Sequence, residues 1–143
     1  AKSPVPTQSI FTADSSGSLT QRSITSGQLL KDFGKIHTDW IFSIAATTDS
    51  NYLFTASGDF SLKQWDIPSS TLLKTYSNLH TDWVRGISIT PDNTSLYTCS
   101  DDCSIKKISI PKQKILKDYG RVHKKLIRCL LIDPYGSFMY SGA

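Results

Sequence analysis

Glutamate is absent from this sequence, and all twelve acidic residues are aspartate. Long apolar segments are absent too, because stretches such as Cys129–Ile132 are far shorter than the ~20 residues that span a bilayer. The first eight residues lack the apolar core of a signal peptide. Cysteine is scarce, with three residues, an odd number and too few for a disulfide scaffold. We therefore expect an intracellular, cytoplasmic chain with reduced cysteines and no membrane span.

Serine and threonine are abundant instead, with 21 and 14 residues, and together they make up a quarter of the chain. Serine, threonine and aspartate favour turns and caps, and threonine also favours strands, whereas glutamate favours helices. Hydrophobic residues are 38% of the 143, which suits one folded domain and excludes a disordered chain. The composition thus predicts a β-rich domain rather than a helical bundle.

Positive charge is concentrated in the second half of the chain. Residues 1–79 hold six basic and six acidic residues, whereas residues 80–143 hold ten and six and carry the whole net charge of +4. The densest segment, Lys106 to Lys125, has eight basic residues against Asp118 alone. Such a segment could bind an anionic ligand, nucleic acid or acidic phospholipid, or form the solvated surface of an outer strand and loop. Stacking aromatics are sparse in it, which favours the solvated surface.

The chain repeats itself with a period of 43 residues. His37, His80 and His123 are 43 residues apart, and the tetrapeptide HTDW begins at the first two of them. Shifting residues 23–65 onto 66–108 matches 18 of 43 positions. Repeats of about 40–45 residues are typical of propeller blades.

Each repeat predicts four short strands. In the second repeat, apolar alternation and turn residues place them at 41–46, 52–56, 61–66 and 71–76. Hairpin turns separate them, and no helical period competes. We therefore predict an all-β fold, a β-propeller of four-stranded antiparallel blades.

The second repeat resembles a blade of the WD-repeat family. The resemblance rests on LFTASGD at Leu53–Asp59, LKQWD at Leu62–Asp66 and the preceding His37, and it extends over nearly the whole chain from about Ile10. In this family each complete blade holds a buried hydrogen-bond chain, from a tryptophan indole to a hydroxyl, to a histidine, to an aspartate. The resemblance implies such a chain here.

The implied chain is complete in only one repeat. In the second repeat it would join His37, Thr55, Asp59 and Trp65. The next repeat keeps His80, Thr98 and Asp102, with Ile108 in the tryptophan position, and the last keeps His123 and Ser141. The first repeat has Thr12, with Ser16 and Arg22 in the aspartate and tryptophan positions.

Two groups of residues also permit a catalytic or metal-binding interpretation. A chain of Thr55, His37 and Asp59 has the composition of a nucleophilic triad. It recurs in pieces in every repeat, whereas catalysis needs one site in a cleft, so we interpret it as structural. Cys99 and Cys103 would need two further ligands to bind zinc, and small buried hydrophobic side chains are the preferred interpretation. We expect no catalytic residue, no metal site and no cofactor.

The 43-residue period divides the chain into about 3.3 blades, fewer than the 4–8 or so of closed propellers. The units expected are an N-terminal extension (1–8), a partial first blade (9–33), a second (34–76) and third (77–119) blade, and a truncated fourth (120–143). Because the chain starts and stops in mid-blade, we expect a fragment of a larger propeller. A half-propeller completed by a second chain is the alternative.

The resemblance implies a non-catalytic scaffold for protein–protein interaction. Its partners would be other proteins, or further blades of the same or another chain. In the family the position just before each innermost strand lies on the top face, and here it holds Trp40, Trp83 and Leu126. Gly58 and Asp101 lie nearby on the turn before the network aspartates, and Arg85 and Arg128 could add charge next to the tryptophans. A tryptophan at such a junction is a common interface anchor. Alternatively, each indole packs down onto its own blade and seals the network beneath.

Overall fold

The computed structural model describes residues 8–143, so the predicted extension at 1–8 lies almost wholly outside the described residues. The described part is built of strands, and the predicted all-β fold class is confirmed. The strands are β1 (Ser9–Ala13), β2 (Ser18–Ser23), β3 (Leu29–Lys35), β4 (Ile41–Ala46), β5 (Tyr52–Ser57), β6 (Leu62–Asp66), β7 (Thr71–Tyr76), β8 (Val84–Ile89), β9 (Ser95–Ser100), β10 (Ser104–Ser109), β11 (Lys114–Arg121), β12 (Cys129–Ile132) and β13 (Met139–Gly142). Among these residues there is no helix that could cross a membrane.

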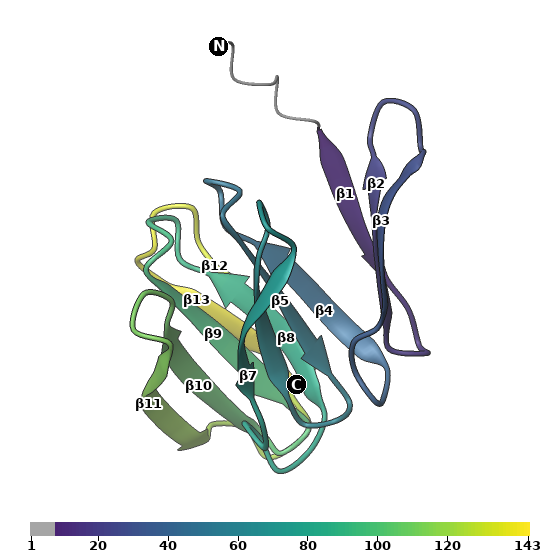
Figure 1. Cartoon of the computed structure of the whole chain (residues 1–143). Helices are drawn as coiled ribbons and strands as arrows, with labels where there is room; N and C mark the ends of the chain where they lie inside the picture. The colour runs from purple at the N-terminus through teal and green to yellow at the C-terminus, as the bar shows by residue number, and fades with distance from the viewer. Residues whose placement is uncertain (1–7) are drawn as a thin grey trace.

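The strands form four separate antiparallel sheets (Figure 1). Sheet 1 has the order β1-β2-β3, sheet 2 β4-β5-β6-β7, sheet 3 β8-β9-β10-β11, and sheet 4 the pair β12-β13. Each strand pairs with its neighbour in sequence, so every connection within a sheet is a hairpin. Together the four sheets make part of a β-propeller.

The innermost strands of sheets 2, 3 and 4 lie side by side, β4 next to β8 and β8 next to β12 (Figure 1). Side-chain hydrogen bonds connect these neighbouring sheets. The amide of Asn93 donates to the hydroxyl of Thr48 at 2.8 Å and accepts from the Thr48 backbone N–H at 3.0 Å, and the backbone N–H of Ile132 donates to the hydroxyl of Ser88 at 3.0 Å. The starts of these three strands therefore lie at one end of neighbouring sheets.

Short side-chain hydrogen bonds set the turns between first and second strands. In sheet 2 the carboxylate of Asp49 accepts from the hydroxyl of Thr47 at 2.6 Å and from the backbone N–H of Asn51 at 3.0 Å. The same pattern recurs 43 residues later, where Asp92 accepts from Thr90. Threonine and aspartate side chains thus shape the same turn in both complete sheets.

The sheets pack face to face through apolar side chains that recur with the same period. The largest core cluster joins the two complete sheets, with Phe54 and Tyr76 of sheet 2 against Leu96 and Ile108 of sheet 3. A second cluster joins Leu19 of sheet 1 to sheet 2, and a third joins sheets 3 and 4. Burying these faces against one another is what stacks the repeats.

Each of the first three sheets presents an aromatic pair to the next sheet. The pairs lie on β1 and β3, on β5 and β7, and on β9 and β11: Phe11 with Phe33 at 6.3 Å between ring centroids, Phe54 with Tyr76, and Tyr97 with Tyr119 at 6.2 Å. A lysine two residues before the second member lies over that ring in each sheet, at 5.4, 5.7 and 4.8 Å. The same aromatic contact between neighbouring sheets thus recurs in each of these three repeats.

Candidate functional site

A connected hydrogen-bond chain crosses sheet 2. The imidazole of His37 contacts the carboxylate of Asp59 through Nδ1 and the hydroxyl of Thr55 through Nε2, both at 2.8 Å. The indole N–H of Trp65 donates to the same hydroxyl at 3.3 Å. His37 is 2% exposed and Thr55 is fully buried, so the network is inside the sheet.

This network ties the loop before β4 to the turn between β5 and β6. The carboxylate of Asp59 also accepts from the backbone N–H of Thr38 at 3.2 Å and from the hydroxyl of Ser61. Burial raises the pKa of Asp59, but the hydrogen bonds from His37 and Ser61 lower it more, so the pKa lies well below its usual range. The ionised carboxylate therefore holds the loop that leads to Trp40.

Sheet 3 repeats the arrangement without an indole. His80 contacts Asp102 and Thr98 at 2.9 Å each, and Ile108 occupies the tryptophan position in the core. Burial lowers the pKa of His80, although the charge of Asp102 opposes that shift. Burial raises the pKa of Asp102, but the hydrogen bond from Ser104 and the charge of His80 outweigh burial and hold it at about 2.

The outer sheets hold smaller versions. In sheet 4, His123 contacts the hydroxyl of Ser141 at 2.7 Å. In sheet 1 the hydroxyl of Thr12 meets that of Thr20 at 2.7 Å, and Ser16 donates to Asp14 at 2.6 Å. Arg22, in the tryptophan position, donates to the carbonyl of Gly27.

An aromatic cluster lies where β4 and β8 begin, and we call it the aromatic face: Trp40, Phe42, Trp83 and Arg85. Trp40 is 53% exposed and Trp83 37%, so neither indole is buried over its own network. The ring of Phe42 stacks on Trp83 at 5.2 Å between centroids and meets Trp40 at 5.9 Å. Phe42 thus joins sheet 2 to sheet 3 at this end.

Arg85 holds the aromatic face together. Its guanidinium lies 4.4 Å from the centroid of Phe42 and 4.8 Å from that of Trp83. Two parallel hydrogen bonds, at 2.9 and 3.0 Å, join it to the carboxylate of Asp101. Because a bidentate pair has fixed geometry, the rings and the guanidinium form a preorganised surface.

Sequence reasoning overlooked Phe42. The signal was available in the period, since Phe42, Arg85 and Arg128 are successive at intervals of 43 residues. Gly58 corresponds in the same way to Asp101 and is buried, with its N–H donating to the carbonyl of Trp40 at 2.9 Å. A Cβ there would lie 3.0 Å from the carboxylate of Asp39, so the absence of a side chain lets that loop approach.

The face changes character over sheet 4. Leu126 takes the tryptophan position and is 36% exposed, and Arg128 is exposed. Lys124 and Lys125 occupy the positions of Thr81 and Asp82 and are exposed as well. The exposed indoles therefore lie over sheets 2 and 3, whereas Lys124, Lys125 and Arg128 lie over sheet 4.

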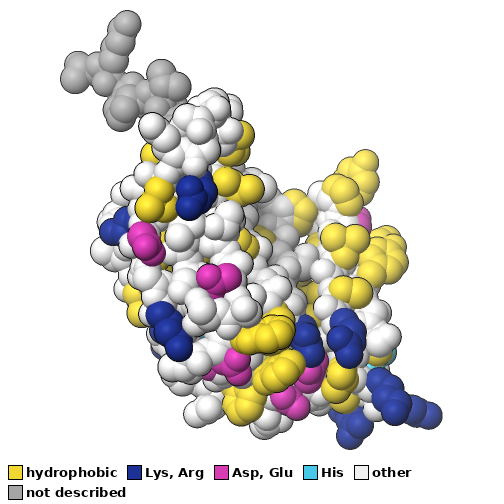
Figure 2. Space-filling view, turned by 90° about the vertical axis from the view of Figure 1, so that its right-hand side faces the viewer, with side chains coloured by type: hydrophobic (Ala, Val, Ile, Leu, Met, Phe, Trp, Pro, Cys, Tyr) yellow, Lys and Arg dark blue, Asp and Glu magenta, His cyan; other side chains and the backbone are white. Residues whose placement is uncertain are grey.

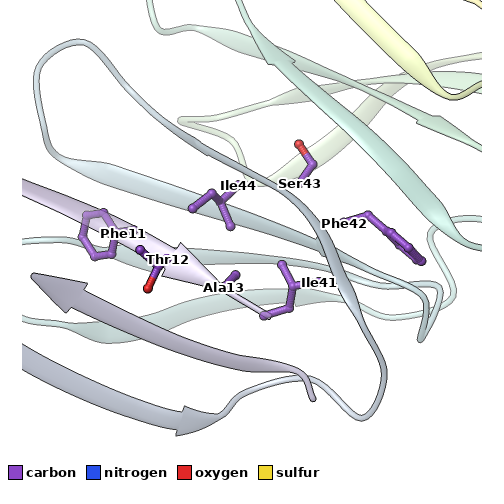
Figure 3. Close-up of a pocket in the computed structure, with 7 residues that line it drawn as sticks. All are labelled: Phe11, Thr12, Ala13, Ile41, Phe42, Ser43 and Ile44. Atoms are coloured by element: carbon purple, nitrogen blue, oxygen red, sulfur yellow. The ribbon is translucent and has the colours of Figure 1, made fainter. Parts of the chain in front are cut away.

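A groove runs between β1 and β4, beside the aromatic face (Figure 3). Its volume is about 220 Å³, and it is lined by Phe11, Thr12, Ala13, Ile41, Phe42, Ser43 and Ile44. Sheets 2 and 3 have an innermost strand at the corresponding place, whereas in residues 8–143 sheet 1 has three strands only.

The basic segment does not form one compact patch. Lys112 and Lys114 lie at one end of the β10–β11 hairpin and Arg121 lies at the other. Because seven residues of extended strand separate Lys114 from Arg121, the two ends are about 23 Å apart. Lys106 is paired with Asp118 at 3.4 Å. Charge of one sign is thus spread along an exposed outer strand.

The three cysteines are free thiols. Cys99 and Cys103 are buried and Cys129 is exposed. Burial raises the pKa of Cys99 to about 12, so this thiol stays protonated. Within residues 8–143 no three side chains of the metal-binding types come together.

A family model described as "WD domain, G-beta repeat" matches residues 27–66 and 70–108, more than half of the chain. The chain belongs to the WD-repeat family. The buried histidine networks and the four-stranded sheets accordingly belong to WD-repeat blades. The search of the curated proteins found no match.

Solved WD-repeat structures have a similar fold. The structure of U3-55K matches with a TM-score of 0.80 and 23% identity over 87% of this chain. The crystal structure of the RRP9 WD40 repeats matches with a TM-score of 0.82 and 23% identity, again over 87%. This chain spans 39% and 38% of the length of those two chains.

Proposed function

We propose that this WD-repeat chain is a non-catalytic scaffold that binds other proteins through its aromatic face. The contact residues are Trp40, Phe42, Trp83, Arg85, Asp101, Leu126 and Arg128, with buried Gly58 shaping the loop behind them. The observation that supports this most directly is the half-exposed indole of Trp40 against Phe42, whose ring lies under a guanidinium already fixed by Asp101. Exposed tryptophan and ordered arginine are the side chains that most often anchor interfaces.

The same geometry favours binding over catalysis. The hydroxyl of Thr55 is fully buried and already shared by His37 and Trp65, so a substrate has no access to it. Further blades, from the same or another chain, are a second kind of partner, because the groove beside β1 lies where sheets 2 and 3 have an innermost strand. The free thiols suit an intracellular, cytoplasmic location.

Binding of nucleic acid or acidic phospholipid at 106–125 is the less favoured function. The basic side chains are spread along β11 rather than gathered, and stacking of Lys117 over Tyr119 occupies one of the few aromatic rings. Titration with single-stranded oligonucleotide or anionic vesicles at rising salt would reveal such binding as a steep loss of affinity.

Photo-crosslinking tests the proposed function. A benzophenone amino acid placed at Thr81, exposed beside Trp83, is expected to give protein adducts that the same probe at Lys114 does not give. The Trp40→Ala/Trp83→Ala variant should lose the Thr81 adducts while unfolding at a similar urea concentration. Loss of stability without loss of adducts would instead assign the two indoles to packing.

A further inference from the structure

At the end of the molecule that carries the aromatic face, acidic and basic side chains lie over different sheets. In sheets 2 and 3 the residues before the tryptophans are Asp39 and Asp82, whereas Lys125 stands at that position in sheet 4 and Lys124 directly before it. Because β4, β8 and β12 are neighbours, acidic and basic halves lie next to each other. In Figure 2, hydrophobic and acidic side chains gather at the lower end of the molecule, with basic side chains to their right.

These charges are not neutralised within the described part of the chain. Its ion pairs join His37 with Asp59, His80 with Asp102, Arg85 with Asp101, and Lys106 with Asp118. Asp39 and Asp82 accept only the backbone N–H of the tryptophan that follows, at 2.7 and 2.8 Å. Within residues 8–143, the two carboxylates on the acidic half thus form no ion pair. The same holds for Lys124, Lys125 and Arg128 on the basic half.

The acidic half also carries the indoles, and a cation can interact favourably with both an indole ring and a carboxylate. A lysine or arginine over an exposed indole gains cation–π attraction, and a carboxylate beside it adds charge attraction. Arg85 already makes this pair of contacts inside the chain, with Phe42 and Trp83 beneath it and Asp101 alongside. Trp40 offers a comparable ring with Asp39 next to it and is more exposed.

We infer that the segment bound by this face is an extended peptide with separated charges, whose basic residues lie over Trp40 and next to Asp39 and Asp82, and whose acidic residues reach Lys124, Lys125 and Arg128. The inference rests on the proposed function and adds the chemistry of the partner. From sheet 2 to sheet 4 the distance is two sheet spacings, about 20 Å, which about six extended residues cover.

Four eight-residue peptides test this inference. Each has two charged residues at either end of the neutral linker Gly-Ser-Gly-Ser: Lys-Lys with Asp-Asp, Lys-Asp with Asp-Lys, Lys at all four positions, and Asp at all four. The first two have the same composition, so they differ only in charge order. Binding is followed by tryptophan fluorescence at low and at physiological salt. The peptide with Lys-Lys and Asp-Asp is expected to bind several-fold more tightly than the other three.

Neutral variants assign each half. Asp39→Asn/Asp82→Asn keeps a hydrogen-bond acceptor for each backbone N–H and removes both charges. It should weaken the separated-charge and all-lysine peptides about three- to tenfold, the effect of two exposed charge contacts. Lys124→Gln/Lys125→Gln should weaken the separated-charge and all-aspartate peptides. Lys112→Gln/Lys114→Gln, with the same change in net charge at the far end of β11, should change none.

Equal affinity for the two peptides of the same composition would overturn the inference, as would equal or tighter binding of a peptide of one charge sign. Absence of binding by all four peptides would also overturn it. The proposed function is judged separately by adducts at Thr81, which do not depend on the charge of any chosen peptide. Adducts without peptide binding would leave a protein-binding face whose partner has a different chemistry.

Discussion

Gly17 lies directly against the carbonyl of His37. A Cβ at Gly17 would be 2.3 Å from the carbonyl oxygen of His37 and 2.9 Å from that of Asp39. The backbone of Gly17 has a φ of +85°, and its carbonyl accepts the N–H of Ile36 at 2.9 Å. The hairpin of sheet 1 therefore supports the loop that enters sheet 2, and only a residue without a side chain fits there.

We expect Gly17→Ala to destabilise the chain more than Gly27→Ala. Both glycines have positive φ, which costs an alanine roughly 1–2 kcal/mol, but nothing lies within 4 Å of a Cβ at Gly27. Overpacking against backbone should add about 1–3 kcal/mol at Gly17. Urea unfolding of both variants measures the difference, and equal losses would show that the loop moves aside freely.

His37→Ala is expected to lower the free energy of unfolding by about 1–3 kcal/mol, because Thr55 and Asp59 lose a partner inside the sheet. His123→Ala serves as the matched control. That histidine is half-buried and contacts Ser141. If His123→Ala lowered the free energy of unfolding as much as His37→Ala, burial of the histidine would not explain the effect.

Trp65 contributes mainly through packing rather than through its hydrogen bond. Its ring meets Phe33 edge-on at 5.7 Å, and its N–H reaches Thr55 at a rather long 3.3 Å. Trp65→Phe should therefore cost about 1 kcal/mol, whereas Trp65→Ala should cost about 3–5 kcal/mol. Similar losses in thermal unfolding for the two variants would assign the dominant role to the hydrogen bond.

Stability should fall as the pH is lowered from 7 to 5, in part through His80. Burial lowers its pKa below 6.5, so below that pH the unfolded chain binds a proton that the folded chain resists. The His80 contribution is thus present above about pH 6.5 and is lost as the pH falls toward the folded pKa. Urea unfolding at both pH values should give a shallower pH dependence for His80→Gln, and an unchanged slope would show that His80 does not contribute.

The sequence predicts the strands well because each depends on local alternation and turn residues. The four strands expected in the second repeat are present, at 41–46, 52–57, 62–66 and 71–76. The histidine contacts follow from the period and the family resemblance, since Thr55 and Thr98 lie at one position of successive repeats.

Other features depend on how neighbouring sheets meet, which the sequence does not encode locally. The sequence pattern around Phe42 predicts an ordinary strand residue, yet its ring stacks on Trp83 of the next sheet. The exposed fraction of Trp40 likewise depends on what lies opposite it, and both packing and exposure were compatible with its position. Contacts across sheets therefore had to come from three-dimensional placement.

The recurring aromatic pairs have an evolutionary consequence. Because Phe11 with Phe33 and Tyr97 with Tyr119 are the same contact two periods apart, a tandem duplication or loss of one whole repeat would join surfaces that already fit. An insertion inside one of these strands would instead place a turn or a lysine where a ring must pack. The chain can thus lengthen or shorten readily by whole repeats of 43 residues, whereas the contact between sheets restrains insertions within its strands.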